Sequence, residues 1–455
     1  MTHPPARSAS KRLPFDIDVA LFYAVMAVAA IFGGSSRYDM VQNILLQPLL
    51  WLLLGVVAMR RVGNLATRPY LLLSLAYGLY LALQLVPLPF SVWSELPGRQ
   101  AIVDLDLALI GESARPFSLV PARTLNALAN LPAILAPLIA FSNIRERAIF
   151  HGVCAIVSCV VLSGMLGLAQ FVTGEGYFYS ITNLGSMVGL FANANHAAVY
   201  GSCGIVIASC AAICARSTMH RSILWAAAIF LFLATIGNGS RAGLVTLAMA
   251  VLVSLLLAYL NMRKKSSASS FSKQWLAIGA IFLLAIGTLG AFFATGRVAA
   301  FDDLVNADPF GDLRFAIAPL LIDMIWEFFP LGSGIGTFEE TFYMFETDEL
   351  LQPNYVNMAH NDWLQLLIEG GLIGALFLLA FIGLFSRTVV GAAKRFSGGA
   401  RLSIVPAVLT FLAILALASA FDYPLRTPLF QATVAVLVAI LASIARPVSP
   451  NDAPN

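Results

Sequence analysis

Long apolar runs separated by short polar stretches recur along almost the whole chain. A helix that crosses a lipid bilayer needs about 20 mostly apolar residues, and twelve stretches approach or meet this requirement. The predicted spans are residues 16–34, 41–59, 69–89, 122–141, 148–172, 194–215, 222–237, 242–260, 274–294, 363–385, 402–420 and 429–445. The pattern therefore predicts an all-α membrane protein, a polytopic bundle of about 12 transmembrane helices with a helical loop on one side.

The composition agrees with a lipid rather than an aqueous environment. Hydrophobic residues make up 59% of the chain and charged residues 11%, whereas a soluble domain carries about 25% charged residues. The net charge of +3 is small and scattered, so no nucleic-acid partner is expected. The five cysteines lie within two apolar runs without paired C-x-x-C spacing. We therefore expect small buried hydrophobic side chains there, not metal ligands or disulfides.

The distribution of basic residues predicts how the chain is oriented. Arg7, Lys11 and Arg12 precede the first apolar run, and no convincing cleavage site follows, so we expect a retained first span rather than a signal peptide. With this end in the cytoplasm, the cytoplasmic loops and tails collect 19 of the 27 basic residues. This is the positive-inside asymmetry, and it places both termini in the cytoplasm.

Two long loops fall on the opposite, outer side. The longer one, residues 295–362, carries twelve carboxylates and two arginines. Within it, residues 312–329 combine an apolar stripe with Asp323 and Glu327, and Asp312 is a suitable N-cap. We expect an amphipathic helix on the outer membrane surface. The second loop, residues 90–121, is rich in proline and aromatic residues and is expected to form an ordered interfacial segment.

Burying an ionisable group inside a bilayer costs free energy, so such a residue suggests a functional site. Within the predicted spans, Glu369 is the one such residue near mid-depth, one helical turn after Gln365. It is either bonded to a neighbouring helix or backbone, as a structural group, or part of a site. Ion-coupled carriers usually need several groups of this kind and broken helices near mid-depth, which makes a transporter the weaker interpretation.

Polar side chains gather instead at three outer helix ends. They are Asn193, Asn195 and His196; Asn238, Ser240 and Arg241; and Asn357, His360, Asn361 and Asp362. Arg241 begins a span on the side where arginine is scarce, and the free N–H groups of a helix start favour an anion such as phosphate. The alternatives are arginines at 241 and 314 that reach lipid headgroups, and an ordinary helix-start histidine at 360.

Other motifs do not indicate a site. Gly332-Ser-Gly-Ile-Gly336 follows no predicted strand, has Thr337 where a dinucleotide motif has its third glycine, and lacks a following Gly-Lys-Ser/Thr. We expect a turn that starts at Pro330. The sequence contains no metal-ligand spacing of His, Cys and Asp and no Gly-x-Ser-x-Gly elbow, so a metal or serine-nucleophile mechanism has no support.

Four ordered motifs resemble the O-antigen ligase/polymerase superfamily. They are Phe191-x-Asn-x-Asn-His196, Gly239-Ser-Arg-Ala-Gly243, Arg314 followed by Pro330-Leu-Gly-x-Gly-x-Gly-x-Phe338, and His360-Asn-Asp-Trp-Leu-Gln-Leu-Leu-Ile-Glu369-x-Gly371. The resemblance covers about residues 150–385. It implies three regions: N-terminal helices in 1–147, a ligase-like core in 148–385 with its loop at 295–362, and C-terminal helices with a tail in 386–455.

The resemblance also implies an activity at the periplasmic face of the bacterial inner membrane. The donor would be a glycan on undecaprenyl diphosphate, and neither a cofactor nor a metal would be required. Arg241 and Arg314 would hold the diphosphate, because guanidinium groups stay protonated and match phosphate oxygens. His360 would take the proton of the acceptor hydroxyl, since imidazole has an ordinary pKa of about 6.5.

The remaining candidate residues would contact or organise the substrates. Asn193, Asn195, His196 and Asn361 are expected to line the donor or acceptor path, while Asp362 and Glu369 bind substrate or orient neighbouring groups. The expected acceptor is lipid A-core or a growing polysaccharide, within the lipid bilayer. Ligase, polymerase and protein glycosylase remain open. Competing hypotheses are a multi-spanning transporter or flippase of lipid-linked glycan, and a non-catalytic scaffold for polysaccharide secretion.

Overall fold

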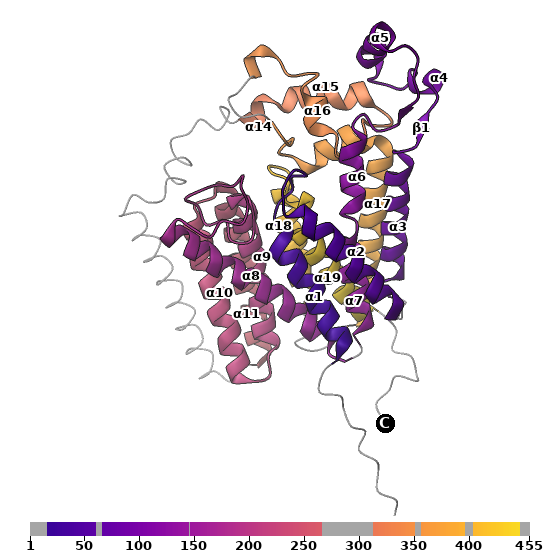
Figure 1. Cartoon of the computed structure of the whole chain (residues 1–455). Coiled ribbons are helices and arrows are strands. Elements are labelled where there is room, and N and C mark those ends of the chain that lie inside the picture. The colour runs from indigo at the N-terminus through magenta and orange to yellow at the C-terminus, as the bar shows by residue number, and fades with distance from the viewer. Residues whose placement is uncertain are drawn as a thin grey trace, which may run out of the picture.

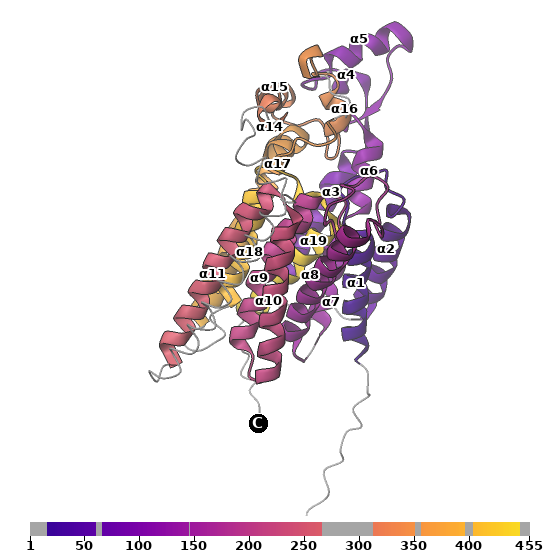
Figure 2. The ribbon, with the colours of Figure 1, turned by 90° about the vertical axis from the view of Figure 1, so that its left-hand side faces the viewer.

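The computed structural model describes residues 16–60, 66–144, 146–265, 313–350, 356–395 and 404–445. This part of the chain is mostly helical, as predicted. The long helices are α1 (Ile17–Phe32), α2 (Asn43–Arg60), α3 (Arg68–Leu83), α6 (Pro121–Ala129), α7 (Pro132–Asn143), α8 (Ala148–Thr173), α9 (Ala194–Cys214), α10 (Thr218–Asn238), α11 (Arg241–Lys265), α17 (Asp362–Arg395), α18 (Ile404–Ala418) and α19 (Pro428–Ala445). They run roughly side by side (Figures 1 and 2).

Of the twelve predicted spans, eleven coincide with helices of the structure. The twelfth, 274–294, lies outside the described residues. Eight segments are long and apolar enough to cross a membrane, with α6 and α7 counted together as Pro121–Asn143. The helices α1 and α18 are apolar but shorter. The chain is therefore a multi-helix membrane protein with eight candidate spans among the described residues.

One hydrophobic core joins helices from the beginning, middle and end of the chain. α19 packs against α1, α7, α8 and α17, and α9 packs against α8, α10, α11 and α18. Both helices are apolar on nearly every side, which is typical of helices surrounded by protein. The buried share is 78% for α19 and 83% for the apolar 18-residue stretch of α9. These two helices are thus the most enclosed of the eight candidate spans.

Two segments of short helices cover one end of the bundle, which we call the capped end (top of Figure 1). The first contains β1 (Pro87–Leu88), α4 (Phe90–Trp93), α5 (Gln100–Leu109) and β2 (Arg115–Pro116), with β1 and β2 paired antiparallel. The second contains α14 (Leu313–Ala316), α15 (Ala318–Phe328), α16 (Phe338–Phe342) and the 3₁₀ turn η1 (Asp348–Leu350). The sequence predicted one helix over 312–329. The structure instead breaks it at Ile317, two residues before Pro319, whose ring disfavours a continuous helix.

A buried arginine fastens the two covering segments together. Arg99 is 1% exposed, and its guanidinium donates to the carbonyl oxygens of Pro97, Phe117 and Gly332 at 2.7, 3.0 and 3.3 Å. It also lies over the ring of Phe328, 5.9 Å from its centroid. Burial lowers the pKa of Arg99 to about 10, so the group stays protonated at neutral pH and the carbonyl dipoles solvate its charge.

The glycine-rich turn at 332–336 is hydrogen-bonded to α17 where that helix is broken. Gly371 has φ +54° and ψ −144° inside that helix, so the regular bonding of the preceding turn is interrupted. Ser333 N donates to the carbonyl oxygen of Ile368 at 3.0 Å, and Gly334 N donates to that of Glu369 at 2.9 Å. A Cβ at Gly332 would meet the Glu369 oxygen at 2.4 Å. The predicted turn is therefore confirmed, and it satisfies backbone groups that lipid could not.

Several helix ends meet beneath these covering segments. Leu429 N donates to the carbonyl oxygen of Gly33 at 2.9 Å, which joins the start of α19 to the end of α1. Asp362 N donates to the oxygen of Ser419 at 2.8 Å, which joins the start of α17 to the end of α18. The 3₁₀ turn η3 (Pro424–Arg426) lies between α18 and α19 in the same region. The polar helix ends singled out in the sequence therefore lie at the capped end.

Candidate functional site

Side-chain caps fix the starts of three helices. The Asn193 oxygen accepts from Asn195 N at 2.8 Å at the start of α9, and Ser240 Oγ accepts from Gly243 N at 3.0 Å at the start of α11. At the start of α17, the Asn361 side-chain oxygen accepts hydrogen bonds from the backbone N–H groups of Trp363 and Leu364, at 3.0 and 3.1 Å. Asn193 and Asn361, predicted to line a substrate path, thus serve as helix caps here.

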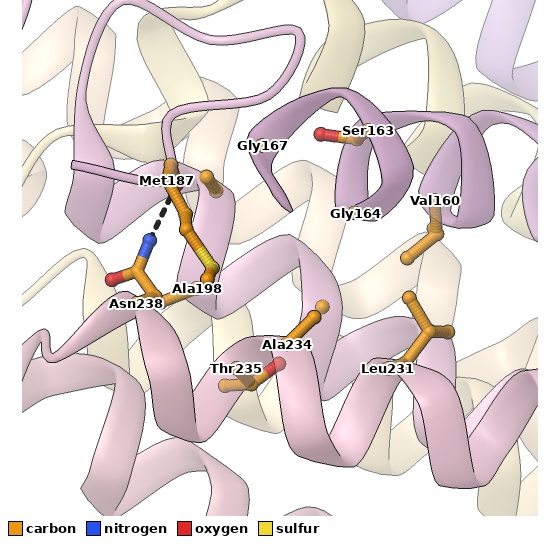
Figure 3. Close-up of a pocket in the computed structure, with 12 residues that line it drawn as sticks. Val160, Ser163, Gly164, Gly167, Met187, Ala198, Leu231, Ala234, Thr235 and Asn238 are labelled. Atoms are coloured by element: carbon orange, nitrogen blue, oxygen red, sulfur yellow. Dashed lines mark hydrogen bonds between the residues drawn. The ribbon is translucent and has the colours of Figure 1, made fainter. Parts of the chain in front are cut away.

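Polar side chains also join these helix starts to one another. Ser240 Oγ donates to the Asn195 oxygen at 2.7 Å, and Asn195 Nδ2 donates to Asp422 Oδ2 at 2.9 Å. Asn238 Nδ2 donates to the carbonyl oxygens of Met187 and Ala194 at 2.6 and 3.1 Å; Figure 3 shows the first of these bonds. The turn before α11 is therefore tied both to the start of α9 and to the segment between α18 and α19.

The small pocket of Figure 3 lies between α8, α9 and α10 beside this turn. Its volume is about 20 Å³, which is enough for about one water molecule. Glycines and alanines account for much of its lining, including Gly164, Gly167 and Ala234. It is too small for a sugar or a diphosphate.

Two histidines converge on the carboxylate of Asp422. His196 Nε2 lies 3.6 Å and His360 Nδ1 lies 3.7 Å from Asp422 Oδ1. Both histidine rings stand edge-on to Tyr423, with centroids 5.0 Å from that ring. The Asp422 side chain is 2% exposed and that of His196 is 1% exposed, whereas that of His360 is 23% exposed. His360 is thus the histidine of the pair that a substrate can reach.

The charge of Asp422 is set by its neighbours. Burial by itself raises the pKa of this carboxyl group, but the nearby imidazoles of His196 and His360 bring it well below its usual range. The same burial raises the pKa of Tyr423. At neutral pH the site therefore contains a buried carboxylate, with a neutral phenol packed against both imidazole rings.

His360 also has an unusual backbone. Its φ is +49°, a left-handed conformation that is uncommon for a residue with a side chain. The next residue caps α17, so the strained residue lies immediately before a fixed helix start. Strain of this kind costs about 1–3 kcal/mol and is concentrated at functional sites. The conformation thus supports a functional role for His360 independently of its contact with Asp422.

A second network joins Asp362 and Glu369 through Arg426. Arg426 Nη1 lies 3.0 Å from Glu369 Oε2, and Arg426 Nε lies 3.3 Å from Asp362 Oδ1. Glu369 Oε1 accepts from Gln365 Nε2 at 2.8 Å. Burial by itself lowers the pKa of Arg426, but the charges of Glu369 and Asp362 raise it above its usual value. Of the two interpretations of Glu369, the structure shows a residue bonded to neighbouring elements.

The two arginines predicted to hold a diphosphate lie on different elements. Arg241 is the first residue of α11, directly after Ser240 of the cap network, and its side chain is exposed. Arg314 lies in α14 of the covering segments and is half-buried. The structure therefore brings Asn195, His196 and His360 together around Asp422, while Asp362 and Glu369 share Arg426.

Sequence reasoning missed Asp422, Tyr423 and Arg426 as site residues. They lie in the segment 421–427 between α18 and α19. The signal was present, because Asp-Tyr-Pro-Leu-Arg precedes the last predicted span just as polar residues precede α9, α11 and α17. A search that treated all polar helix ends on this side alike would have included them.

A larger cavity of about 310 Å³ lies beside the Arg426 network. Its lining comes from α3, α6, α7 and α17, from Gln431 of α19, and from residues 36–39, 130–131, 335–339, 357–358 and 425–426. Asn357, Met358 and Asp362, which flank His360 in the sequence, all line it. Within the described ranges, no group of three or more His, Cys, Asp or Glu side chains is arranged to hold a metal ion.

Comparison with known families identifies one region of the chain. Residues 226–379 match the family model described as O-antigen ligase, which covers less than half of the chain. The matched region contains Arg241, Arg314, His360 and Glu369, and it ends before Asp422. No curated protein matches the sequence. The resemblance to this family is confirmed, and three of the four motifs lie within the matched residues.

Proposed function

The chain carries an O-antigen ligase family region at residues 226–379, and on that premise we propose that it transfers a glycan from undecaprenyl diphosphate to an acceptor hydroxyl. The family match and the apolar helices support a glycosyltransferase-like enzyme of a bacterial inner membrane. The reaction would take place at the capped end. The asymmetry of basic residues supports placing that end at the periplasmic face.

The convergence of His360 and His196 on buried Asp422 is the observation on which this proposal depends. The carboxylate lies 3.7 Å from Nδ1 of His360, the more exposed of the two histidines, and would orient that imidazole by its charge. His360 accepts the proton of the acceptor hydroxyl. The hydroxyl oxygen then bonds to the anomeric carbon of the donor sugar, and the bond from that carbon to the diphosphate oxygen breaks with its electron pair going to the diphosphate.

The departing diphosphate gains negative charge, which Arg241 and Arg314 would neutralise. Arg241 presents an exposed guanidinium at a helix start, where unpaired N–H groups already favour an anion. Electrostatic stabilisation of this kind typically lowers a reaction barrier by about 3–4 kcal/mol for each well-placed donor. His196, which is 1% exposed, would act through Asp422 rather than by touching substrate.

A transporter or flippase of lipid-linked glycan is the alternative. It requires polar groups free to bind a coupling ion or to move across the bilayer. Glu369, the acidic residue that favoured this interpretation, is ion-paired with Arg426 and hydrogen-bonded to Gln365. Its pairing with fixed neighbours disfavours an ion-coupling role, so the transferase remains our proposal.

The test is a pair of substitutions in cells of the source bacterium, His360→Ala and Arg241→Ala. Each should abolish the polysaccharide product seen by gel electrophoresis, while the amount of membrane-inserted protein stays the same. His220→Ala and Arg387→Ala are matched controls, because both residues are exposed and lie away from the capped end. Wild-type glycan amount and length in the His360 and Arg241 variants would exclude the proposed catalytic roles.

The product that accumulates in a deletion strain separates the two main forms of this activity. Single unpolymerised repeats on the lipid carrier indicate a polymerase. Full-length chains on the carrier, together with an unmodified lipid A-core, indicate a ligase.

A further inference from the structure

The 310 Å³ cavity is lined by charged and amide side chains together with aromatic and aliphatic ones. Its size lies at the lower end of the range of about 300–1,000 Å³ typical of small-molecule sites. It is next to the proposed base in the chain, because Met358 and Asp362 line it on either side of His360. His360 itself does not line the cavity, so a hydroxyl group of a molecule bound here would have to extend out of it to reach the imidazole.

Every charged side chain that lines the cavity is paired within the protein. Arg37 is paired with Asp39 at 2.9 Å, and Arg426 with Asp362 and Glu369 at 3.3 and 3.0 Å. The third arginine, Arg123, is paired with Glu339 at 2.8 Å and also with Glu340. The lining thus contains three arginines and four carboxylates, and all of the arginines already have carboxylate partners. An anionic ligand would have to compete with these ion pairs.

Uncharged polar groups, in contrast, remain available. Gln47 Nε2 donates to the oxygens of Asn126 and Asn130 at 2.7 and 3.5 Å. This arrangement leaves the two Nδ2 groups without a hydrogen-bond partner among the described residues. Gln431 Nε2 donates to the Leu425 carbonyl at 3.0 Å, which leaves its own oxygen available as an acceptor. The cavity therefore offers both donors and acceptors, as the hydroxyl groups of a sugar require.

Aromatic and aliphatic side chains form the rest of the wall. Tyr77 and Trp363 line the cavity together with Leu366 and Leu131. The Tyr77 ring is held by Phe377, with centroids 5.4 Å apart, and its hydroxyl makes no hydrogen bond within the described part of the chain. An aromatic wall beside amide groups suits the C–H face and the hydroxyl edge of a sugar ring.

We propose that this cavity binds an uncharged sugar, namely the acceptor unit whose hydroxyl His360 activates, and that Asn126, Asn130 and Gln431 select it. The proposal rests on the proposed function, because it assigns the acceptor subsite of that reaction. It adds a restriction on charge. A uronic acid or a phosphorylated sugar would bring an anion next to Asp362, Glu369 and Glu339 without an unpaired cation to receive it.

Saturation-transfer difference NMR on the full-length protein in detergent tests this directly. The probes are methyl glycosides of glucose, galactose, rhamnose and N-acetylglucosamine, with methyl glucuronide and methyl galacturonide as charged counterparts of the first two. We expect at least one neutral glycoside to bind, and the corresponding uronide to bind roughly tenfold more weakly or not at all. Failure of every neutral glycoside to bind, or equal binding of the uronides, would overturn the proposal.

Substitutions locate the binding in this cavity. Asn126→Leu and Asn130→Leu are close in shape to the natural side chains and remove the donors, so each should weaken binding by roughly fivefold. Asn130→Lys adds an unpaired cation and should improve uronide binding. The matched control is Gln100→Leu, an amide replacement on the exposed surface of α5. Unchanged binding in correctly folded Asn126 and Asn130 variants would place the sugar elsewhere.

The His360→Ala variant distinguishes this proposal from the proposed function. It should bind the neutral glycoside normally while its product in cells is lost. If product is lost but no sugar binds even to the wild-type protein, the acceptor subsite is wrong and the transferase stands. If the product is unaffected while the sugar binds, the catalytic role of His360 is wrong.

Discussion

Asp422 is the residue around which the candidate site is organised. Its Oδ1 faces two imidazoles and its Oδ2 accepts a hydrogen bond from Asn195. The hydrogen bond fixes the Asn195 amide, while the two imidazoles lie 3.6 and 3.7 Å from the same carboxylate. Because Asn195 also accepts from Ser240, the position of His360 is coupled to the start of α11, where Arg241 lies. The proposed proton acceptor and the proposed phosphate-binding residue are therefore connected through one polar network.

Replacement of Asp422 by asparagine should slow glycan transfer about a hundredfold, toward the lower end of the range for general-base catalysis. The amide keeps the size of the side chain but removes the charge that orients His360. In a reconstituted assay with lipid-linked donor, kcat should fall while the KM for donor changes little, because Arg241 remains in place. Asp422→Glu should restore part of the rate.

An equivalent substitution at the surface serves as the control. Asp104→Asn on α5 changes an exposed carboxylate and should leave transfer unchanged. Loss of folded protein in Asp422→Asn, or a rise in donor KM with kcat preserved, would contradict the positioning role.

The sequence indicated which polar residues lie at helix starts, but not what those side chains do there. The sequence singled out Asn193, Asn361 and Ser240 because polar groups at span ends are conspicuous. In the structure their oxygens cap helices, a need that every buried helix start has. The polar stretch before the last span marks Asp422 as a candidate, but its central role comes from contacts with residues 60 and more positions away in the chain, which the sequence alone does not reveal.

At the scale of elements, α17 is the helix that connects the site with the covering segments. It begins at the Asn361 cap, carries Asp362 and Glu369 toward Arg426, and is interrupted at Gly371. The hydropathy pattern predicted this span well, since 363–385 falls within Asp362–Arg395. The interruption was not predicted, because a glycine within an apolar run is also common in regular membrane helices.

Two glycines in α17 provide a matched comparison. Gly371→Ala should destabilise the protein, because the residue has φ +54° and a Cβ would meet the Pro330 oxygen at 2.3 Å. Backbone strain alone accounts for about 1–3 kcal/mol. Gly383→Ala has no atom within 4 Å of the new Cβ and should be neutral or slightly stabilising.

Thermal unfolding in detergent measures both glycine variants. The unfolding midpoint should fall for Gly371→Ala and stay equal or rise for Gly383→Ala. Equal midpoints for the two variants would mean that the break in α17 relaxes without cost.

At the scale of the whole molecule, the helices form one bundle with a shared core and one covered end (Figure 2). The core includes residues from before, within and after the family-matched region. Span positions followed directly from hydropathy, whereas the packing of α19 between α7 and α17 did not. Apolar side chains specify burial but not a partner, so the order of helices around the centre is a property of the assembled chain.

Cysteine labelling tests the orientation that the basic residues predict. In a variant with all five native cysteines replaced, Leu107→Cys on α5 at the capped end should react in intact spheroplasts with a membrane-impermeant maleimide. His220→Cys at the start of α10 should react only after the membrane is permeabilised. Both positions are exposed, so accessibility within the protein does not separate them. The reverse pattern would place the candidate site in the cytoplasm and exclude a periplasmic donor.

The turn at 332–336 and the break in α17 have a consequence for hybrids between related proteins. The turn supplies the N–H donors of Ser333 and Gly334, and the broken helix supplies the carbonyl acceptors of Ile368 and Glu369. A crossover placed between them would join a turn from one parent to a helix from another. Hybrids that exchange residues 313–380 as a block should therefore insert and fold more often than those recombined near residue 350, even when both carry the same number of substitutions.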